Sequence, residues 1–531
     1  MVPGAPPAGP RPALQGLSRP SRRTFLALAG GAVLAVGGGT AAALSSGKQD
    51  DDGGEAFATP LAIPPLAEAE VAGGVRSFRL KAGSGLTELL PGVSFRTMGY
   101  NGTFLGPTLR AARGETVRVA VTNGLTTATT AHWHGMCLPA AQDGTPHQSI
   151  SRGETWTAEW TVDQPAATLW YHPHPHGQTE EQVVRGLAGL FLIDEAVDDA
   201  GAAGLPSEYG VDDIPLILQD VAVASGGRTE GGRTQAPVGR LGNTVLANGT
   251  HQAHFAASTP LLRLRVLNAS SARCYNLGLK GGGRLWLVGT DGGLVPDPTA
   301  LERVLLSPGE RAEVLVELAP GADVVLRSFT HELGMGGDEE LAGARDEFDL
   351  LRISGPAGGV SAGIPASLPA PELSSLPAGP PQGATVRTFN LGEKSINGAT
   401  MAMDRIDLSV PAGAVELWRV ENSSDHAHNF HVHGVQFRVR SVTGKDGAGM
   451  AAQLGWKDTV LVRPGESVDL VVPFGKHTDP DVPYMYHCHL LWHEDQGMMG
   501  QFTVVDPGSV EPGTETEAPT TLSAPAGSHH S

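Results

Sequence analysis

The amino-acid sequence predicts an all-β fold of about three domains, and three observations support this. Short runs of Val, Leu and Thr recur between turn residues, and the chain contains 71 Gly and 40 Pro among its 531 residues. A chain of this length exceeds one compact core and suits domains of roughly 150 residues each. Two distant parts of the chain also repeat one sequence pattern. Together these features favour a series of small β domains.

The domain boundaries follow from changes in composition along the chain. Strand-like alternation fills three regions, and a Pro/Ala/Gly-rich segment separates the second region from the third. The C-terminal end is rich in Pro, Thr, Glu and Ser, which favours disorder. We expect an N-terminal extension at 44–74, domain 1 at 75–195, domain 2 at 210–355, a linker at 356–384, domain 3 at 385–507 and a disordered tail at 508–531.

The outer two domains repeat each other. HWHG at 132–135 matches HVHG at 431–434, and WYHPH at 170–174 matches MYHCH at 485–489. Domain 2 keeps the strand and asparagine of the repeat, as Arg265-Val266-Leu267-Asn268, without the histidines. The sequence therefore predicts that two ligand-bearing copies flank a copy with no metal ligands.

Charge and cysteine content exclude some classes of partner. The formal net charge is −19, which disfavours nucleic acid and anionic membrane surfaces. The three cysteines, Cys137, Cys274 and Cys488, could form at most one disulfide. They are better explained as ligand or core residues.

The N-terminus resembles a twin-arginine export signal. Arg22 and Arg23 precede an apolar, charge-free stretch and then small residues through Ala43, where we expect cleavage. A membrane anchor needs about 20 apolar residues, and this run is shorter, although retention as an anchor remains the alternative. We expect an exported protein that is extracellular, in the cell envelope or periplasmic.

Ten of the 19 histidines fall in four short motifs. Residues i and i+2 of a strand point to the same face, so each His-x-His pair presents two imidazoles to one site. Imidazole suits copper, zinc, iron and nickel, so the spacing alone leaves the metal open. The motif histidines are His132, His134, His172, His174, His428, His431, His433, His487, His489 and His493.

Cys488 decides which metal is expected. It lies between His487 and His489, so its sulfur should face away from their imidazoles. Two His, one Cys and a weak Met ligand form a blue-copper electron-transfer site. We expect the set on the sulfur side to be His428, Cys488, His493 and Met498.

The eight remaining imidazoles exceed what one metal accepts. They suit three coppers, two with three histidines each and one with two. An electron entering at the Cys488 copper would have a covalent path into His487 and His489. The donor is expected to approach an exposed edge of His428 or His493.

These motifs resemble those of three-domain multicopper oxidases over most of residues 75–506. HWHG, WYHPH, HNFHVHG at 428–434 and HCHLLWHEDQGMM at 487–499 carry the likeness. Within the family, WYHPHPHGQTEEQVVRGLAGLFLID and HEDQGMM look like bacterial laccase-like enzymes and periplasmic copper-efflux oxidases. The resemblance implies three cupredoxin-like Greek-key β-sandwiches, four copper ions, and oxidation of a small reductant coupled to reduction of dioxygen to water.

The resemblance also assigns roles by motif position. The copper with two histidines takes His132 and His431, and the acids that relay protons match Asp143 and Glu494. Asn429 stands where the family usually has Pro, which leaves the histidine register intact. The coupled copper pair takes His134, His172, His174, His433, His487 and His489.

The donor and some nearby residues stay open. Phenols and aromatic amines are the leading donors, and cuprous ion is the variant. Copper-efflux relatives carry a Met-rich insertion, whereas residues 340–400 here contain no Met, and only Met401 and Met403 form a nearby pair. A two-domain copper nitrite reductase would have fewer histidines. A copper-sequestering protein without turnover is the non-enzymatic alternative.

Several further residues are expected to be bystanders. HPHPH offers two registers, of which the preceding Trp-Tyr favours His172 and His174 over His176. We interpret the others as loop histidines, inert thiols or tail residues: His147, His426, Cys137, Cys274, His529 and His530.

Overall fold

A computed structural model describes Met1 and residues 57–195, 204–223, 237–369, 381–443, 453–509 and 520–521. The predicted export signal, most of the predicted tail with His529 and His530, and residues 370–380 of the predicted linker lie outside these ranges. The chain divides into two compact units, 1–48 and 49–531, and the elements below belong to the second unit. Within the described ranges, no helix combines the length and apolar character needed to cross a bilayer.

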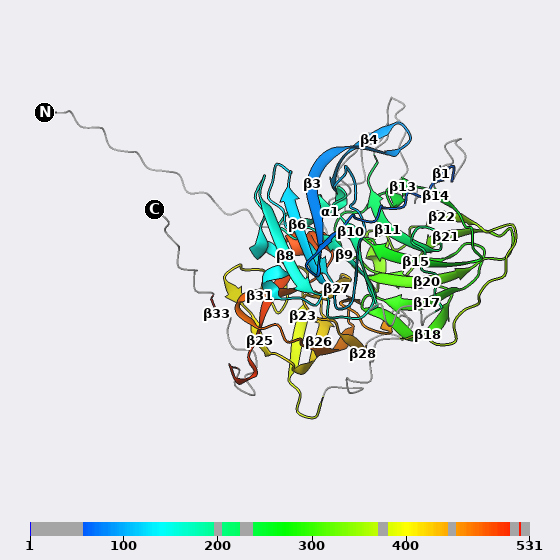
Figure 1. The fold of residues 1–531 in the computed structure, drawn as a ribbon. Helices are drawn as coiled ribbons and strands as arrows, with labels where there is room; N and C mark the ends of the chain where they lie inside the picture. Colours follow the sequence, from blue (N-terminus) through cyan, green and yellow to red (C-terminus); the bar gives the residue numbers. More distant parts are fainter. Residues whose placement is uncertain are drawn as a thin grey trace. The chain divides into compact units, whose positions relative to one another are not determined.

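The first sandwich occupies residues 70–194 and appears in blue and cyan in Figure 1. One sheet has the order β2-β3-β6-β8, with β4 paired to β3, and the other has the order β5-β10-β9-β7. The strands are β2 (Glu70–Ala72), β3 (Val75–Leu90), β4 (Val93–Tyr100), β5 (Leu109–Ala112), β6 (Thr116–Asn123), β7 (His132–His134), β8 (Thr155–Thr161), β9 (Ala167–His172) and β10 (Gly189–Asp194).

The middle sandwich is drawn mostly in green and pairs a six-stranded with a seven-stranded sheet. The first has the order β1-β14-β22-β21-β16-β19, and the second β13-β12-β11-β15-β20-β17-β18. The strands are β1 (Thr59–Pro60), β11 (Asp213–Val221), β12 (Thr244–Ala247), β13 (Thr250–His251), β14 (Ala253–Ala256), β15 (Leu261–Asn268), β16 (Tyr275–Leu279), β17 (Leu285–Thr290), β18 (Gly293–Leu301), β19 (Val304–Leu306), β20 (Arg311–Glu317), β21 (Asp323–Phe329) and β22 (Phe348–Ser354).

The third sandwich runs from yellow to red, and its histidine-bearing sheet contains the strand order of the corresponding sheet in the first sandwich. Its sheets have the orders β23-β26-β30-β28 and β25-β32-β31-β27-β29, and a short pair, β24-β33, lies beside them. The strands are β23 (Val386–Leu391), β24 (Arg405–Ile406), β25 (Leu408–Pro411), β26 (Val415–Asn422), β27 (His428–Val432), β28 (Arg438–Thr443), β29 (Thr459–Val462), β30 (Ser467–Pro473), β31 (Asp479–His487), β32 (Met499–Val505) and β33 (Thr520–Thr521).

Hydrophobic alternation explains why these segments form sandwiches. In β6 every second residue is buried, as in Val117, Val119 and Val121, and these side chains meet Leu169 and Phe191 of the opposite sheet. The middle and third sandwiches have equivalent cores. Alternate burial over short strands is what two packed sheets require. The predicted all-β class is confirmed.

Two short α-helices interrupt the strands near the histidine motifs. They are α1 (Thr179–Val184) and α2 (Leu491–Asp495), and each follows a His-x-His motif. The Asp495 carboxylate accepts hydrogen bonds from the backbone amides of Thr179 (2.8 Å) and Glu180 (3.0 Å). Since these two amides open α1 and have no partner inside the helix, Asp495 caps α1 from the third sandwich. Single 3₁₀ turns cover Ala140–Gln142, Pro146–Gln148, Gly336–Asp338 and Pro507–Ser509.

Candidate metal centre

Paired strands of the outer sandwiches present the histidines in matching register. In the first sandwich, β7 and β9 are antiparallel, with His132 opposite His172. In the third, β27 and β31 are antiparallel, with His431 opposite His487. The same strand geometry therefore delivers imidazoles from both ends of the chain.

The imidazoles of the two sandwiches interleave. His132 stacks on His433 with ring centroids 3.9 Å apart, and His134 stacks on His431 at 3.8 Å. The Nε2 atom of His487 lies 3.1 Å from Nε2 of His433. The eight histidines thus form one buried cluster whose members come from residues about 300 positions apart.

Donor nitrogens converge within this cluster in groups of three. Each group has its donor atoms within 4.8 Å of one another, as a shared metal ion requires. The groups formed only by histidine are His174 with His433 and His487; His132 with His134 and His172; and His132 with His431 and His433. The predicted cluster histidines are therefore together in space.

Outer hydrogen bonds fix the orientation of most rings. Nδ1 of His132 donates to the Asp143 carbonyl (2.9 Å), and Nδ1 of His431 donates to the Asp458 carbonyl (2.8 Å). Metal-binding histidines typically donate their second ring nitrogen in this way. Comparable contacts hold His134 through Asp458, His172 through the Pro173 carbonyl, His433 through Asp143, and His487 through the Cys488 carbonyl.

The inward nitrogens include several without a protein partner. Nε2 of His132, Nε2 of His431 and both ring nitrogens of His489 are buried and make no hydrogen bond. Buried polar atoms rarely lack a partner, and a bound ion is one standard reason for an exception. The residues present therefore fit a metal cluster.

Burial also keeps these rings in the form that binds metals. Desolvation, followed by repulsion between neighbouring rings, holds the pKa of His134, His431 and His433 well below the usual range. Burial lowers the pKa of His487 to about 3. These four imidazoles are thus neutral at neutral pH, and a neutral ring nitrogen can coordinate a metal.

A second group lies on the opposite side of Cys488. Its Sγ atom is 3.5 Å from Nδ1 of His428 and 3.6 Å from Nδ1 of His493, and these two nitrogens are 3.1 Å apart. The rings of His487 and His489, on either side of Cys488 in the sequence, stack with centroids 5.4 Å apart and belong to the eight-histidine cluster instead. There they contact His174 and His134. One short segment therefore links two sites through covalent bonds.

Met498 is adjacent to this group. It is fully buried in the same apolar cluster as Cys488, and its carbonyl accepts a hydrogen bond from the Cys488 amide at 3.1 Å. In the absence of a metal, burial raises the pKa of the Cys488 thiol to about 12. The thiolate therefore needs a cation beside it.

The prediction that the donor approaches an exposed edge of His428 or His493 is wrong. His428 and His493 are both 0% exposed. Nε2 of His493 donates to the Pro237 carbonyl at 2.8 Å, and Nε2 of His428 lies 2.9 Å from the Ser424 hydroxyl. The sequence did not predict this cover, because Pro237 is 256 residues from His493.

The two predicted acids lie on different sides of the cluster. Oδ2 of Asp143 accepts from Nδ1 of His433 at 2.7 Å. The carboxylate of Glu494 lies 3.3 Å from Nδ1 of His174 and 3.4 Å from Nδ1 of His487. Burial, reinforced by the charge of Asp495, raises the pKa of Glu494 well above its usual range. Glu494 can therefore keep a proton next to the cluster.

Comparison with known proteins agrees with this donor set. Models described as multicopper oxidase match residues 83–198 and 375–508. A multicopper oxidase of Staphylococcus haemolyticus is 34% identical over 439 residues, which cover 82% of this chain and 89% of that protein. The chain belongs to the multicopper oxidase family. It is a copper-dependent oxidoreductase that uses dioxygen and a reducing substrate.

Two other similar proteins indicate the range of this multicopper oxidase family. The solved structure of a laccase-like multicopper oxidase, CueO of Ochrobactrum sp., has a TM-score of 0.75 and 35% identity, and the match covers 84% of this chain and 100% of that chain. The cell division protein FtsP of Yersinia pestis is 35% identical over 419 residues, covering 77% of this chain and 84% of that protein. The cupredoxin-like sandwich architecture expected from the sequence is confirmed.

Sequence motifs missed one group of residues that this multicopper oxidase places behind the ligands. Asp458 accepts a hydrogen bond from Nε2 of His134 (2.9 Å) and binds both terminal nitrogens of Arg311 (2.8 and 2.5 Å). Arg311 belongs to the middle sandwich and also donates to the Thr168 carbonyl of the first. All three sandwiches therefore meet at one buried ion pair. The sequence did contain one signal of this ion pair: two charged residues, Lys457 and Asp458, directly precede the apolar strand β29.

Asn429 also has a definite role in the multicopper oxidase site. Its side-chain amide donates to the Pro308 carbonyl (2.8 Å), and its Oδ1 accepts from the His489 backbone amide (2.6 Å). Oδ1 also lies 3.6 Å from Sγ of Cys488. The family's usual Pro could make none of these side-chain contacts.

The predicted bystanders lie outside the converging donor groups of the described residues. His176 is exposed, and His147 contacts Gln501. His426 is half-buried. All three cysteines are free, and burial raises the pKa of both Cys137 and Cys274 to about 12.

Proposed function

We propose that this multicopper oxidase binds four copper ions per chain and is a laccase-like oxidase of small organic donors. The observation that carries the proposal is the buried sulfur of Cys488 with its two imidazole neighbours, next to eight further converging imidazoles. Eleven soft or borderline donors in two connected groups suit copper better than harder metals.

The copper assignment follows the donor atoms. His428, Cys488 and His493, with Met498 as the weak ligand, take one copper. His132 and His431 take another, supported by the unpartnered Nε2 atom on each. The coupled pair takes the remaining six. The group of His174, His433 and His487 supports one half, and the other half falls to His134, His172 and His489.

When bound, the coppers supply one-electron acceptance on the sulfur side and reduction of dioxygen to water at the cluster. The chain contributes the route between them, because Cys488 is covalently joined to His487 and His489. Reduction of one dioxygen to two waters consumes four electrons and four protons. Glu494 holds a proton beside His174 and His487, and Asp143 accepts a hydrogen bond from Nδ1 of His433.

Phenols and aromatic amines are the proposed donors. The relative from Ochrobactrum is described as having oxidase activity towards lignin model compounds and lignosulfonate. Residues 340–400 contain no Met to bind cuprous ion, which makes a copper-tolerance role the second candidate.

The protein is proposed to be exported through its twin-arginine signal, in keeping with the motif at Arg22-Arg23. Cleavage near Ala43 would yield an extracellular, cell-envelope or periplasmic enzyme.

Oxygen consumption tests the function directly. Copper-loaded protein is assayed with phenols, aromatic amines, bilirubin, ferrous ion and cuprous ion. A laccase-like oxidase consumes one dioxygen per four phenols oxidised. Consumption with cuprous ion alone would assign the copper-tolerance role, and no consumption with any donor would refute oxidase activity.

A further inference from the structure

The sulfur-side histidines are covered, so an organic donor cannot touch either ring. The outward nitrogen of His493 is already hydrogen-bonded to the Pro237 carbonyl, and that of His428 is beside Ser424. Pro237 belongs to the segment 237–242, which packs on α2: the Cα of Gly239 is so close to Trp492 that an added Cβ would lie 3.0 Å from the Trp492 Cβ. A donor bound behind this segment would be linked to His493 through the Pro237 carbonyl.

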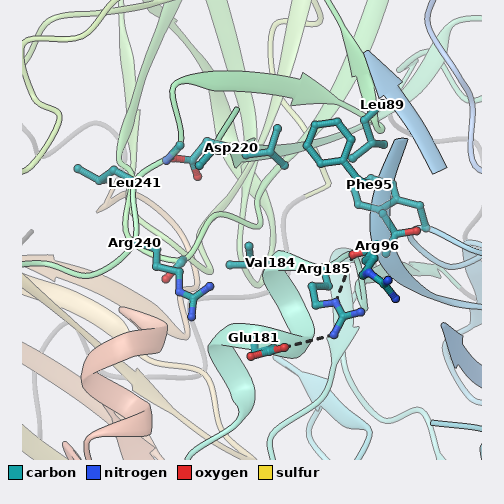
Figure 2. Close-up of a pocket in the computed structure, with 15 residues that line it drawn as sticks. Leu89, Phe95, Arg96, Glu181, Val184, Arg185, Asp220, Arg240 and Leu241 are labelled. Atoms are coloured by element: carbon teal, nitrogen blue, oxygen red, sulfur yellow. Dashed lines mark hydrogen bonds and ion pairs between the residues drawn. The ribbon is translucent and has the colours of Figure 1, made fainter. Parts of the chain in front are cut away.

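The far side of segment 237–242 lines a cavity of about 200 Å³. Figure 2 shows apolar residues on two sides of it, with Leu89 and Phe95 from the first sandwich on one side and Leu241 from the segment itself on the other. Phe104 and Val221 complete the apolar lining. We call it the segment-237 cavity.

Three guanidinium groups lie around the same cavity, as Figure 2 shows. Arg240 is paired with the buried Glu180 (3.0 Å) and Arg185 with the exposed Glu181 (3.2 Å). Arg96 is exposed at the rim and forms no ion pair with any carboxylate of the described residues. An apolar wall with a free cation at its mouth suits a ring that carries a negative group.

Two links connect the cavity wall to residues close to the sulfur-side site in the sequence or in the same apolar cluster. Leu241 lines the cavity and is also part of the buried apolar cluster that contains Cys488 and Met498. Ser271 lines it too, and its carbonyl accepts a hydrogen bond from the Leu491 amide, two residues before His493. The segment from Leu241 back to Pro237 ends at the His493 hydrogen bond.

We propose that the segment-237 cavity binds the electron donor, and that the donor class is a single-ring phenol carrying a carboxylate. This inference rests on the proposed oxidase function. The cavity is smaller than the roughly 300–1,000 Å³ of sites for drug-sized ligands, so it excludes polymers. With a copper held by His428, Cys488 and His493, the phenol would give up one electron by way of Pro237 and His493 and release its hydroxyl proton to water, which would leave a phenoxyl radical.

Binding of a redox-inactive analogue tests the site without turnover. 4-Methoxybenzoate is titrated into copper-loaded protein by calorimetry, and one molecule per chain is expected to bind. Arg96→Gln raises the Kd by up to about fivefold, which is the effect of losing one exposed ion pair. Arg118→Gln is the matched control, because Arg118 is an exposed arginine of the same sandwich, paired with Glu159 and away from the cavity. It leaves the Kd unchanged.

Filling the cavity tests the donor role. Val184 lines the cavity at the end of α1 and is half-buried. Val184→Trp lowers kcat/KM for 4-hydroxy-3-methoxybenzoate by about tenfold, the loss of roughly 1.4 kcal/mol of binding. Hexacyanoferrate(II), which has no ring to bury, is oxidised at the wild-type rate, and the blue absorption is unchanged.

The outcomes separate this inference from the oxidase function. If the wild type oxidises phenols but 4-methoxybenzoate does not bind, the cavity is not the donor site and the oxidase function stands. If 4-methoxybenzoate binds but Val184→Trp leaves kcat/KM for the phenol unchanged, the cavity is not the electron-entry site. A protein that oxidises neither the phenol nor hexacyanoferrate(II) contradicts the oxidase function itself. Should Val184→Trp lose its blue colour, Arg96→Gln at the exposed rim decides, through KM for the same phenol.

Discussion

The first and third sandwiches use one scaffold for different numbers of metal sites. Both place a His-x-His pair on a short strand opposite a second His-x-His motif, with His132 opposite His172 and His431 opposite His487. Their histidine-bearing sheets also share a strand order, β5-β10-β9-β7 and β25-β32-β31-β27. One face of each scaffold therefore builds half of the cluster.

The opposite face differs at three positions. When the two sandwiches are aligned on His132 with His431 and His172 with His487, the first sandwich has no metal donor at the positions of His428, Cys488 and His493. Thr129 uses its hydroxyl to bind Gln182 (2.6 Å), and Gln178 is exposed. The sulfur-side site thus depends on three strong donor side chains that the first sandwich lacks at the matching positions. The pairs are Thr129 and His428, Pro173 and Cys488, and Gln178 and His493.

Removing the Cys488 sulfur should remove the metal site that distinguishes the third sandwich from the first. This change is expected to have the largest effect on activity. Cys488→Ser abolishes the blue absorption, and oxygen consumption falls by more than the 10- to 100-fold that loss of an outer partner costs. The cause is loss of both the ligand and the covalent route. Visible absorption and oxygen uptake measure the result, with Cys137→Ser as the control that keeps both. Unchanged colour in Cys488→Ser would contradict the assignment.

Breaking the junction behind the ligands should come next. Asp458→Asn leaves the buried Arg311 with only the more distant carboxylate of Asp291 (3.7 Å) and is expected to destabilise the protein by up to about 3–5 kcal/mol. Activity falls about 10- to 100-fold, because His134 exchanges a charged acceptor for the weaker amide oxygen of Asn. Urea unfolding and oxygen uptake measure both effects.

The control for this change is Asp469→Asn. Like Asp458, Asp469 pairs with an arginine, but its partner Arg419 has a side chain that is 43% exposed. The expected loss of unfolding free energy is therefore about 1 kcal/mol or less. Equal losses for the two variants would show that burial of the Asp458 pair has no special role.

Acid should weaken the contact between the first and middle sandwiches. Burial alone would raise the pKa of Glu313, but Arg263, Arg265 and the Thr168 hydroxyl hold it at about 2. Because the folded state binds this proton less readily, Glu313 contributes stability above pH 4.5 and loses it as pH falls towards 2. The shift corresponds to about 3 kcal/mol.

Unfolding free energies at pH 6 and pH 3 check this contribution. Glu313→Gln is less stable at pH 6 and depends less steeply on pH, whereas Glu317→Gln, at the exposed end of the same strand, matches the wild type. An unchanged pH dependence in Glu313→Gln would contradict the role of this carboxylate.

The smallest effect is expected from replacing His176, the third histidine of HPHPH, which is not one of the predicted copper ligands. His176→Gln keeps the copper content, and its oxygen uptake stays within about twofold of the wild type, because exposed residues away from a site contribute little. Metal analysis and oxygen uptake measure this. Loss of copper would mean that HPHPH is used in its other register.

The sequence predicted the all-β class, the family and the grouping of the ten motif histidines, because strand alternation and ligand spacing are local properties. It could not predict Arg311, whose partner Asp458 is 147 residues away and belongs to another sandwich. The covered ring of His493 was missed for the same reason. Asn429 was noticed as a departure, but its contact with Pro308 depends on how two sandwiches pack.

Copper content tests the central claim most directly. Metal analysis of fully loaded protein should give four coppers per chain in the wild type and three in Cys488→Ser, with the cluster retained. Fewer than four in the wild type, or loss of the cluster coppers together with the sulfur-side copper, would contradict the division into two connected sites.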